Sequence, residues 1–213
     1  MKSQTLCLFF FLVFSLAGFS QSMDTIKLPA PQTVGGKPLM EVLKMRKSTR
    51  SYTPLELSMQ ELSNMLWAGC GISRPESGKR TAPSAMDWQE VDIYVSLKTG
   101  TYQYEPHANE LIPVLAGDIR SQTGVQGFVA MAPVNLIFVA DYSKMKGRSE
   151  ELLATYAGTD TGFISENIYL YCASAGLGTV VRGMLDRDAL KKTLGLPEYK
   201  HVVYAQSVGY PAL

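Results

Sequence analysis

The sequence predicts an α+β fold in which helices flank a central, mostly antiparallel sheet. Strand-like and helix-like segments mix without the strict βαβ alternation of a doubly wound sheet. Residues 133–140 are apolar except for Asn135, which is typical of a central buried strand. Residues 160–175 have helical spacing and are apolar around most of the circumference, which indicates a helix buried in a core or an interface.

The composition restricts the classes of function. The chain has 213 residues, 46% hydrophobic and 18% charged, which suits a globular domain with a sizeable core. Lys and Arg number 20 and Asp and Glu number 19, so we expect no nucleic-acid partner. The two histidines, His107 and His201, have no metal-ligand spacing, and we expect no metal site.

The first twenty residues are predicted to be a secretory signal peptide. Lys2 supplies a positive start, residues 6–19 are almost wholly apolar, and Gly18 and Ser20 occupy the small-residue positions before a cut. The apolar run is shorter than the ~20 residues of a spanning helix, so we expect no stable membrane anchor after cleavage. The mature protein is therefore expected to be exported, most simply to the periplasm.

Residues 21–38 are expected to be an extended arm, because Pro29, Pro31 and the pair Gly35-Gly36 disfavour regular structure. Such an arm has no core of its own, and either lies over a partner subunit or is loose. Residues 39–213 are then a single domain.

The first two helices are predicted from different sequence features, an apolar face and a capping box. Leu39, Val42 and Leu43 share one helical face that runs toward the cationic residues 46–50. The second helix begins at a capping box, Ser58 to Glu61, and continues to about residue 69.

The remaining elements follow from periodicity and turn residues. Residues 72–81 are expected to be a polar loop. Strands are predicted at 91–95, 102–104, 111–115, 133–140, 179–181 and 201–209. Helical structure is predicted in part of 117–129, at 150–156, at 160–175 with Gly176 as its stop, and from Asp186 to Gly195.

Several familiar sites are excluded. Gly78-Lys79 lacks the spacing of a phosphate loop, there is no Gly-x-Ser-x-Gly elbow, and Gly176-x-Gly178 follows a helix instead of opening one. Cys70 and Cys172 lie in apolar helical patterns and are expected to be small buried hydrophobes, with a disulfide between them left open.

Three stretches carry a family resemblance. Arg46-Lys47-Ser48-Thr49-Arg50 supplies guanidinium and hydroxyl groups that suit a phosphate. Residues 83–89, Pro-Ser-Ala-Met-Asp-Trp-Gln, lead into a strand, and residues 176–183 follow the long helix. In this order the three resemble the FMN-binding segments of the nitroreductase family, and the likeness runs from about Leu39 to Pro211. Residues Gly100 to Tyr104, together with the segment at Leu111 and the pair Gly117-Asp118, resemble one branch, the SagB/ThcOx-type dehydrogenases, although cross-strand packing also explains the tyrosines.

The resemblance implies roles for individual residues and a homodimer with shared flavin sites. Phosphate and ribityl contacts fall to Arg46 and Ser48, a backbone contact to Lys47, and the pyrimidine side of the ring to Arg50. From the other subunit of the dimer, Pro83, Ser84 and Ala85 would line the ring. Near the polar edge of the ring, or supporting it, would be Asp87 and Gln89, and the residues passing N5 would be Val181, Arg182 and Gly183.

The implied protein is an exported FMN-dependent oxidoreductase that transfers hydride through flavin N5 to or from a small organic substrate. Reduction of quinones or nitro-compounds is one alternative, and a non-catalytic flavin-binding module is another. No catalytic acid is assigned, although Tyr156 and Tyr171 were considered. Asp87 stands where the family usually has Asn, and after Pro211 the sequence lacks the family's later basic residues, for which Arg182 is a candidate substitute.

Overall fold

The computed structural model describes residues 23–212, so the predicted signal peptide lies outside the described residues. The strands are β1 (Ile26–Lys27), β2 (Ile72–Arg74), β3 (Lys79–Arg80), β4 (Val91–Ser96), β5 (Gly100–Glu105), β6 (Glu110–Ala116), β7 (Val134–Asp141), β8 (Gly178–Arg182) and β9 (Lys200–Gly209). The helices are α1 (Leu39–Met45), α2 (Met59–Cys70), α3 (Glu150–Ala175) and α4 (Arg187–Thr193). Four 3₁₀ turns occupy Ala85–Asp87, Arg120–Thr123, Gly127–Met131 and Tyr142–Lys144.

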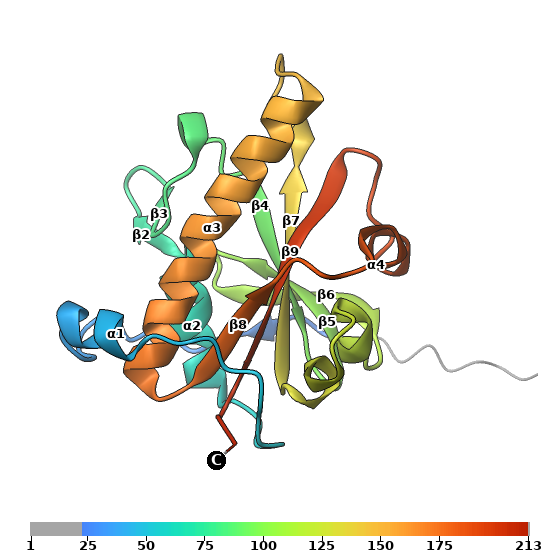
Figure 1. Cartoon of the computed structure of the whole chain (residues 1–213). Helices are drawn as coiled ribbons and strands as arrows, with labels where there is room; N and C mark the ends of the chain where they lie inside the picture. Colours follow the sequence, from blue (N-terminus) through green and yellow to red (C-terminus); the bar gives the residue numbers. More distant parts are fainter. Residues whose placement is uncertain (1–22, 213) are drawn as a thin grey trace, which may run out of the picture.

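Seven strands form one sheet in the order β1-β6-β5-β4-β7-β9-β8, and all neighbouring strands are antiparallel. The long helix α3 crosses in front of this sheet in Figure 1, with α2 beside it and α4 at the far side. The predicted α+β class with a central antiparallel sheet is confirmed.

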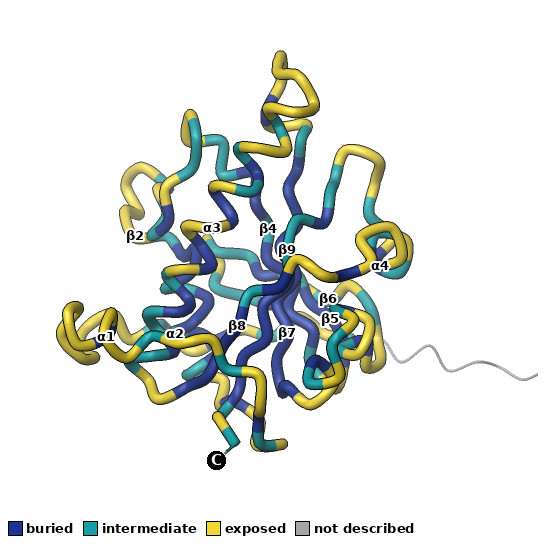
Figure 2. Tube along the Cα trace, in the orientation of Figure 1, coloured by how far each residue is buried: buried dark blue, intermediate teal, exposed yellow. Residues whose placement is uncertain are grey.

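Two cores lie on the two faces of the sheet. On one face, Met65 of α2 and Ile168 of α3 are buried in the same cluster as Phe138. On the other face, Leu190 of α4 packs in a second cluster with Ile137. All eight residues of β7 are buried between β4 and β9, as predicted for the central strand, and the strands form the dark centre of Figure 2.

The predicted capping box begins α2. The Ser58 Oγ atom accepts a hydrogen bond from the Glu61 amide at 3.2 Å, and the Glu61 carboxylate accepts one from the Ser58 amide at 2.8 Å. At α4, the Asp186 carboxylate caps the helix by accepting from the Ala189 amide at 2.9 Å.

The predicted break between two helices at residues 157–159 was wrong, because α3 is one helix of 26 residues. Gly158 disfavours helix by only about 1 kcal/mol relative to alanine, and packing against the sheet outweighs that cost. The hydroxyls of Thr155 and Thr159 donate to carbonyls of the preceding turn and leave the helix intact. Gly176 ends α3 with φ of 77°, as its position predicted.

The arm is attached to its own chain, in contrast to the expectation that it has no core. β1 pairs with β6, and Leu28 is 5% exposed in the main core. The Ser63 hydroxyl donates to the Pro29 carbonyl at 2.6 Å. One other segment differs in detail: residues 72–81, predicted as a loop, contain the β2–β3 hairpin. The helical structure predicted in part of 117–129 is present as 3₁₀ turns.

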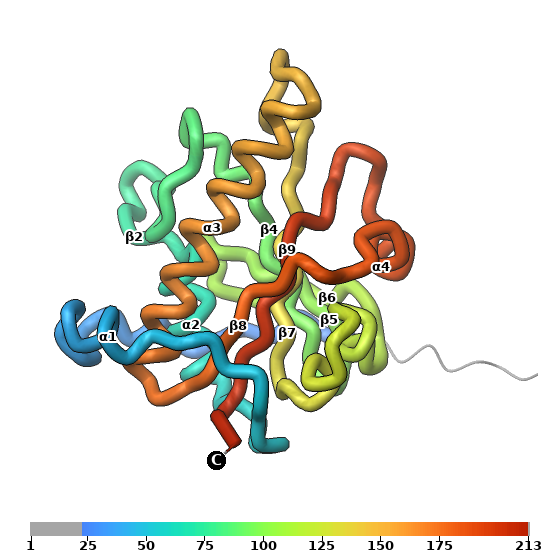
Figure 3. Tube along the Cα trace, viewed as in Figure 1, coloured from blue at the N-terminus to red at the C-terminus, as the bar shows by residue number. Residues whose placement is uncertain are grey.

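The cationic segment after α1 runs along the outer edge of β8, which Figure 3 shows as the light blue chain beside the red strand. Ser48 forms a parallel bridge with Thr179, and Tyr52 forms an antiparallel bridge with Pro211. The Thr49 amide donates to the Thr179 carbonyl at 2.9 Å. The backbone therefore fixes residues 48–52 against the last two strands.

Cys70 and Cys172 are both buried and free, as expected of small hydrophobes. Burial raises the pKa of the Cys70 thiol to about 11, so this thiol is protonated at neutral pH. Among the helices of residues 23–212, none is both long enough and apolar enough to cross a membrane.

Candidate functional site

Arg46 and Ser48 converge on one aromatic residue of α3. Arg46 caps the end of α1, and its guanidinium carbon lies 5.3 Å from the ring centroid of Tyr169. The Oγ atom of Ser48 lies 3.0 Å from the Tyr169 hydroxyl. The Val181 amide of β8 donates to the same hydroxyl at 3.0 Å. Two of the three predicted FMN-binding stretches therefore meet at Tyr169.

Tyr169 was missed from the sequence, where Tyr156 and Tyr171 were considered instead. Its helical spacing carried a signal, because Ser165 and Cys172 lie four residues before it and three after it, on the same face. All three are buried against the sheet. A tyrosine on the buried face of a helix needs a partner for its hydroxyl, and Ser48 and Val181 supply it.

A groove of about 240 Å³ begins at Tyr169, between α3 and the ends of β8 and β9. Val181 and Gly183 line one side and Ser165 and Glu166 the other. The predicted residues 181–183 thus border an open groove next to the cationic segment.

The guanidinium of Arg182 does not share this environment, since the residue is only 4% exposed. It donates to the Thr123 carbonyl at 2.6 Å and to the Asn135 side chain at 3.0 Å. Burial lowers the pKa of Arg182 to about 10, and the group remains charged at neutral pH. The guanidinium thus binds the Arg120–Thr123 turn. The sequence suggested that Arg182 could bind the phosphate, and these contacts do not support that role.

Lys47 and Arg50 are exposed, and Lys47 lines a second pocket of about 140 Å³, which Tyr169 also borders. Within residues 23–212, neither these two side chains nor Arg46 forms an ion pair. Three uncompensated cations therefore lie along the edge of β8, which is an arrangement suited to an anion.

The third predicted stretch, residues 83–89, forms a tight turn before β4. Met86, Asp87 and Gln89 have φ of 52°, 55° and 49°, in the left-handed region that costs a non-glycine residue about 1 kcal/mol. Hydrogen bonds stabilise the turn: the Gln89 amide donates to Ser84 Oγ at 3.0 Å, and the Gln89 side chain donates to Asp87 at 3.2 Å.

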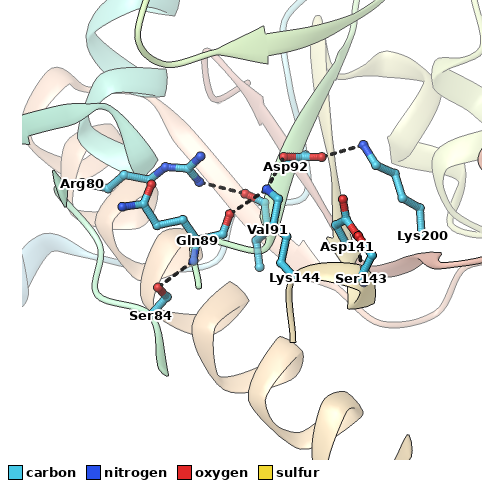
Figure 4. A network of polar contacts seen from close by, with 9 residues as sticks. All are labelled: Arg80, Ser84, Gln89, Val91, Asp92, Asp141, Ser143, Lys144 and Lys200. Carbon is cyan, nitrogen blue, oxygen red and sulfur yellow. Dashed lines mark hydrogen bonds and ion pairs between the residues drawn. The ribbon is translucent and has the colours of Figure 1, made fainter. Parts of the chain in front are cut away.

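Charged side chains hold the far end of this turn, as Figure 4 shows. The Lys144 ammonium donates to the Gln89 carbonyl at 3.1 Å and lies 3.7 Å from the Asp92 carboxylate. Lys200 approaches the same carboxylate to 2.7 Å, and Arg80 donates to the Val91 carbonyl at 3.1 Å. This network fixes the start of β4 and therefore the end of the turn.

Two buried carboxyl groups lie behind the turn. Asp160 of α3 is 3% exposed and accepts from the Ala85 amide at 2.8 Å. Glu90 is fully buried, and within residues 23–212 neither of its carboxylate oxygens has a hydrogen-bond partner. Burial and the nearby carboxylate of Asp160 raise the pKa of Glu90 to about 7.

The two groups of predicted residues lie on different sides of α3. The group at residues 83–89 contacts Asp160, whereas the group at residues 46–50 and 181–183 contacts Tyr169. Nine residues separate Asp160 and Tyr169, which corresponds to about 14 Å along the helix axis and half a turn around it. A single chain therefore presents two separate halves of the predicted site.

Comparison with known proteins identifies the family. The sequence pattern of the Nitroreductase family matches residues 43–210, most of the chain. The chain belongs to the nitroreductase family. A nitroreductase homologue of Methanocaldococcus jannaschii is 30% identical over 186 residues, which cover 83% of this chain and 93% of the relative.

Solved structures agree with this nitroreductase assignment. A nitroreductase homologue of Ralstonia eutropha is 43% identical with a TM-score of 0.85, and the match covers 89% of this chain and 90% of the other. The NADPH:FMN oxidoreductase of Vibrio harveyi is 21% identical with a TM-score of 0.61, covering 82% of this chain and 69% of that one, and so shares the fold.

The family resemblance and the nitroreductase fold predicted from the sequence are confirmed, and the chain is a nitroreductase-family oxidoreductase. Members of this family typically use a flavin. Among the described residues, no group of three or more His, Cys, Asp or Glu side chains is arranged to hold a metal ion.

Proposed function

We propose that this nitroreductase-family protein is an FMN-dependent oxidoreductase that acts on a small organic substrate. The observation that carries the proposal is the meeting of Arg46, Ser48 and Val181 at Tyr169, beside an open groove. The Vibrio harveyi protein of the same fold is named NADPH:FMN oxidoreductase, which is consistent with a flavin at this site.

The donor set fits one end of FMN. Arg46 and Ser48 would hold the phosphate and the ribityl chain, and Lys47 would contribute a backbone contact. Arg50 would place a cation near N1 and O2, where reduction develops negative charge. Residues 181–183 would lie along the edge that carries N5. When bound, the flavin supplies the hydride-transfer chemistry, and the chain supplies position and charge.

The proposed active form is a homodimer, because residues 83–89 face away from Tyr169 within one chain. Pro83, Ser84 and Ala85 would line the flavin of the partner subunit, with Asp87 and Gln89 near its polar edge. Exposed apolar side chains support this proposal: Leu39 is 61%, Met40 76% and Phe163 43% exposed. Monomeric proteins rarely expose large contiguous apolar patches.

The finer assignment to the SagB/ThcOx-type dehydrogenases is a proposal that rests on residues Gly100 to Tyr104, the segment at Leu111 and the pair Gly117-Asp118. Tyr102 and Tyr104 of β5 are buried in the main core, so packing accounts for them without reference to substrate. Reduction of quinones or nitro-compounds is the competing direction. Analysis of products from azoline, quinone and nitro-aromatic substrates would distinguish the two directions.

Export to the periplasm is proposed from residues 1–20 alone. Fractionation of cells that express the full chain tests it. Cleaved protein in the periplasmic fraction is the expected result, and uncleaved protein confined to the cytoplasm would contradict export.

An FMN titration of the purified protein tests the main proposal. Added FMN is expected to bind at micromolar concentration or below, to lose fluorescence, and to raise the melting temperature by mass action. Unchanged fluorescence and melting temperature at saturating FMN would disprove the cofactor assignment. Bound FMN that no substrate class oxidises or reduces would instead favour a non-catalytic module.

A further inference from the structure

We propose that Tyr169 is a positioning residue that directs the Ser48 hydroxyl proton toward the flavin phosphate. The inference rests on the proposed FMN function and adds a residue and a direction of hydrogen bonding. It starts from the row of polar atoms formed by the Val181 amide, the Tyr169 hydroxyl and the Ser48 hydroxyl, in which both separations are 3.0 Å.

The direction of the first hydrogen bond is fixed by chemistry. The Val181 backbone N–H can only donate, so the Tyr169 oxygen accepts. The Tyr169 hydroxyl keeps one proton of its own, and Ser48 Oγ is the acceptor within reach.

Burial decides the direction of the second hydrogen bond. Tyr169 is 6% exposed, so a hydroxyl proton left without an acceptor would carry a desolvation cost of about 1–3 kcal/mol. Ser48 is exposed, and its proton can reach a ligand or solvent at little cost. The favoured order is therefore Val181 N–H to Tyr169, Tyr169 O–H to Ser48, and Ser48 O–H outward.

This order prepares Ser48 to bind an anion. A hydroxyl that already accepts a hydrogen bond becomes a better donor, because hydrogen bonds in a chain polarise one another. The Arg46 guanidinium lies over the ring of the same tyrosine whose hydroxyl contacts Ser48. Tyr169 therefore positions both the cation and the hydroxyl donor. The bridge between Ser48 and Thr179 fixes the backbone below them. An FMN phosphate bound here would meet a cation and an aligned donor.

Two substitutions test the proposal by fluorescence titration with FMN and with riboflavin, which lacks the phosphate. Tyr169→Phe removes the hydroxyl and keeps the ring under Arg46, and Ser48→Ala removes the final donor. Ser48→Ala is expected to raise the Kd for FMN by roughly tenfold to a hundredfold, the value of a charge-assisted hydrogen bond, and Tyr169→Phe by roughly threefold to tenfold, the value of a neutral one. Riboflavin affinity should change by less than about threefold, since no hydrogen bond to a charged group is lost.

The double variant tests whether the two hydroxyls act as a unit. If they do, Tyr169→Phe will add little to the loss already caused by Ser48→Ala, and the two effects will not sum. Additive losses, or equal losses of FMN and riboflavin, would overturn the proposal. So would an FMN affinity of Tyr169→Phe within twofold of the native chain.

Controls separate this inference from folding and from the proposed function. Ser48→Thr keeps a hydroxyl and should retain FMN affinity within a fewfold of native, whereas Ser48→Ala should not; equal affinities of the two would refute the role of the hydroxyl. If Tyr169→Phe does not fold, this comparison still tests the Ser48 donor on which the proposed role of Tyr169 depends. Native chain that binds neither FMN nor riboflavin would contradict the proposed function itself, a result distinct from native binding that Tyr169→Phe leaves unchanged.

Discussion

The backbone amide of Ala85 is held by the carboxylate of Asp160 at 2.8 Å, on the side of α3 opposite to Tyr169. One helix therefore supports both groups of predicted flavin contacts and also keeps them apart. The distance between the two groups is set by the rigid helix and not by a loop.

Arg46 and Arg50 of the cationic segment should act on different parts of FMN, the phosphate and the ring. Arg46→Ala is expected to weaken FMN binding by about 1.5–3 kcal/mol, because a charge-assisted contact is lost. Arg50→Ala should weaken binding less and lower the flavin's reduction potential, since a cation near N1 favours the reduced form. Fluorescence titration and redox titration measure the two effects. Lys44→Ala removes an exposed charge of α1 and is the matched control; if all three variants behave alike, the segment is only surface charge.

Glu90 should make stability decrease with rising pH. Burial and Asp160 raise its pKa from 4.5 to about 7 in the folded state, so the folded chain binds the proton more tightly than the unfolded chain. The contribution is complete below about pH 4.5, decreases as pH rises, and is lost above about pH 7. Denaturant unfolding from pH 4.5 to 8 should show this decrease, and Glu90→Gln should remove it. A native slope that persists in Glu90→Gln would assign the effect to other groups.

Gly124 should be intolerant of a side chain because of Arg182. A Cβ atom at residue 124 would collide with the Arg182 guanidinium, which Thr123 and Asn135 hold in place. Gly124→Ala is expected to destabilise the fold by roughly 2 kcal/mol or more, through displacement of a buried cation from its partners. Gly127→Ala is the matched control, since a Cβ there meets no atom within 4 Å. Thermal unfolding compares them, and equal melting temperatures would contradict the tight packing.

Phe163 should lie in the proposed dimer interface. It is 43% exposed on α3, and Phe163→Glu would bury a charge in an apolar contact and favour the monomer. Light scattering should give twice the monomer mass for the native chain and a reduced mass for the variant. Ile112→Glu changes a residue of 42% exposure on β6 and should remain dimeric. A native monomer that retains flavin would refute the shared site.

The nicotinamides are not expected to be the physiological reductants, if the chain is exported as proposed. NADH and NADPH are kept inside the cell, and the sequence has no dinucleotide fingerprint. A quinone, a small organic substrate or an exported redox protein should exchange electrons with the flavin instead. In stopped-flow mixing, micromolar NADH should bleach the FMN-loaded protein slowly compared with the true partner. Rapid bleaching by NADH would contradict this expectation.

Local signals predicted most of the elements. The capping box at Ser58 and Glu61, the stop at Gly176 and the apolar run around Phe138 each depend on neighbouring residues, and the structure has all three where expected. The continuity of α3 through Gly158 was not predicted, because contacts with a distant sheet decide it. The pairing of β1 with β6 joins segments about 85 residues apart and has no local signature.

The motifs at 46–50, 83–89 and 176–183 predict the segments of the candidate site, and this set of residues stays a prediction. The sequence does not say how the three segments are arranged. Their placement about α3 depends on which helical faces carry Asp160 and Tyr169, and on the path of the chain along β8. The direction of the Arg182 guanidinium depends on Thr123 and Asn135, which are far away in sequence.

The bridge from Ser48 to Thr179 also bears on aggregation. β8 is the last strand of the sheet, and an uncovered edge strand offers free backbone groups to the strands of other molecules. Residues 48–52 cover this edge on the way to the bridge between Tyr52 and Pro211. Without the docked segment, this strand would present its unpaired backbone groups to neighbouring molecules. Substitutions that loosen this segment are then hazards for solubility as well as for ligand affinity.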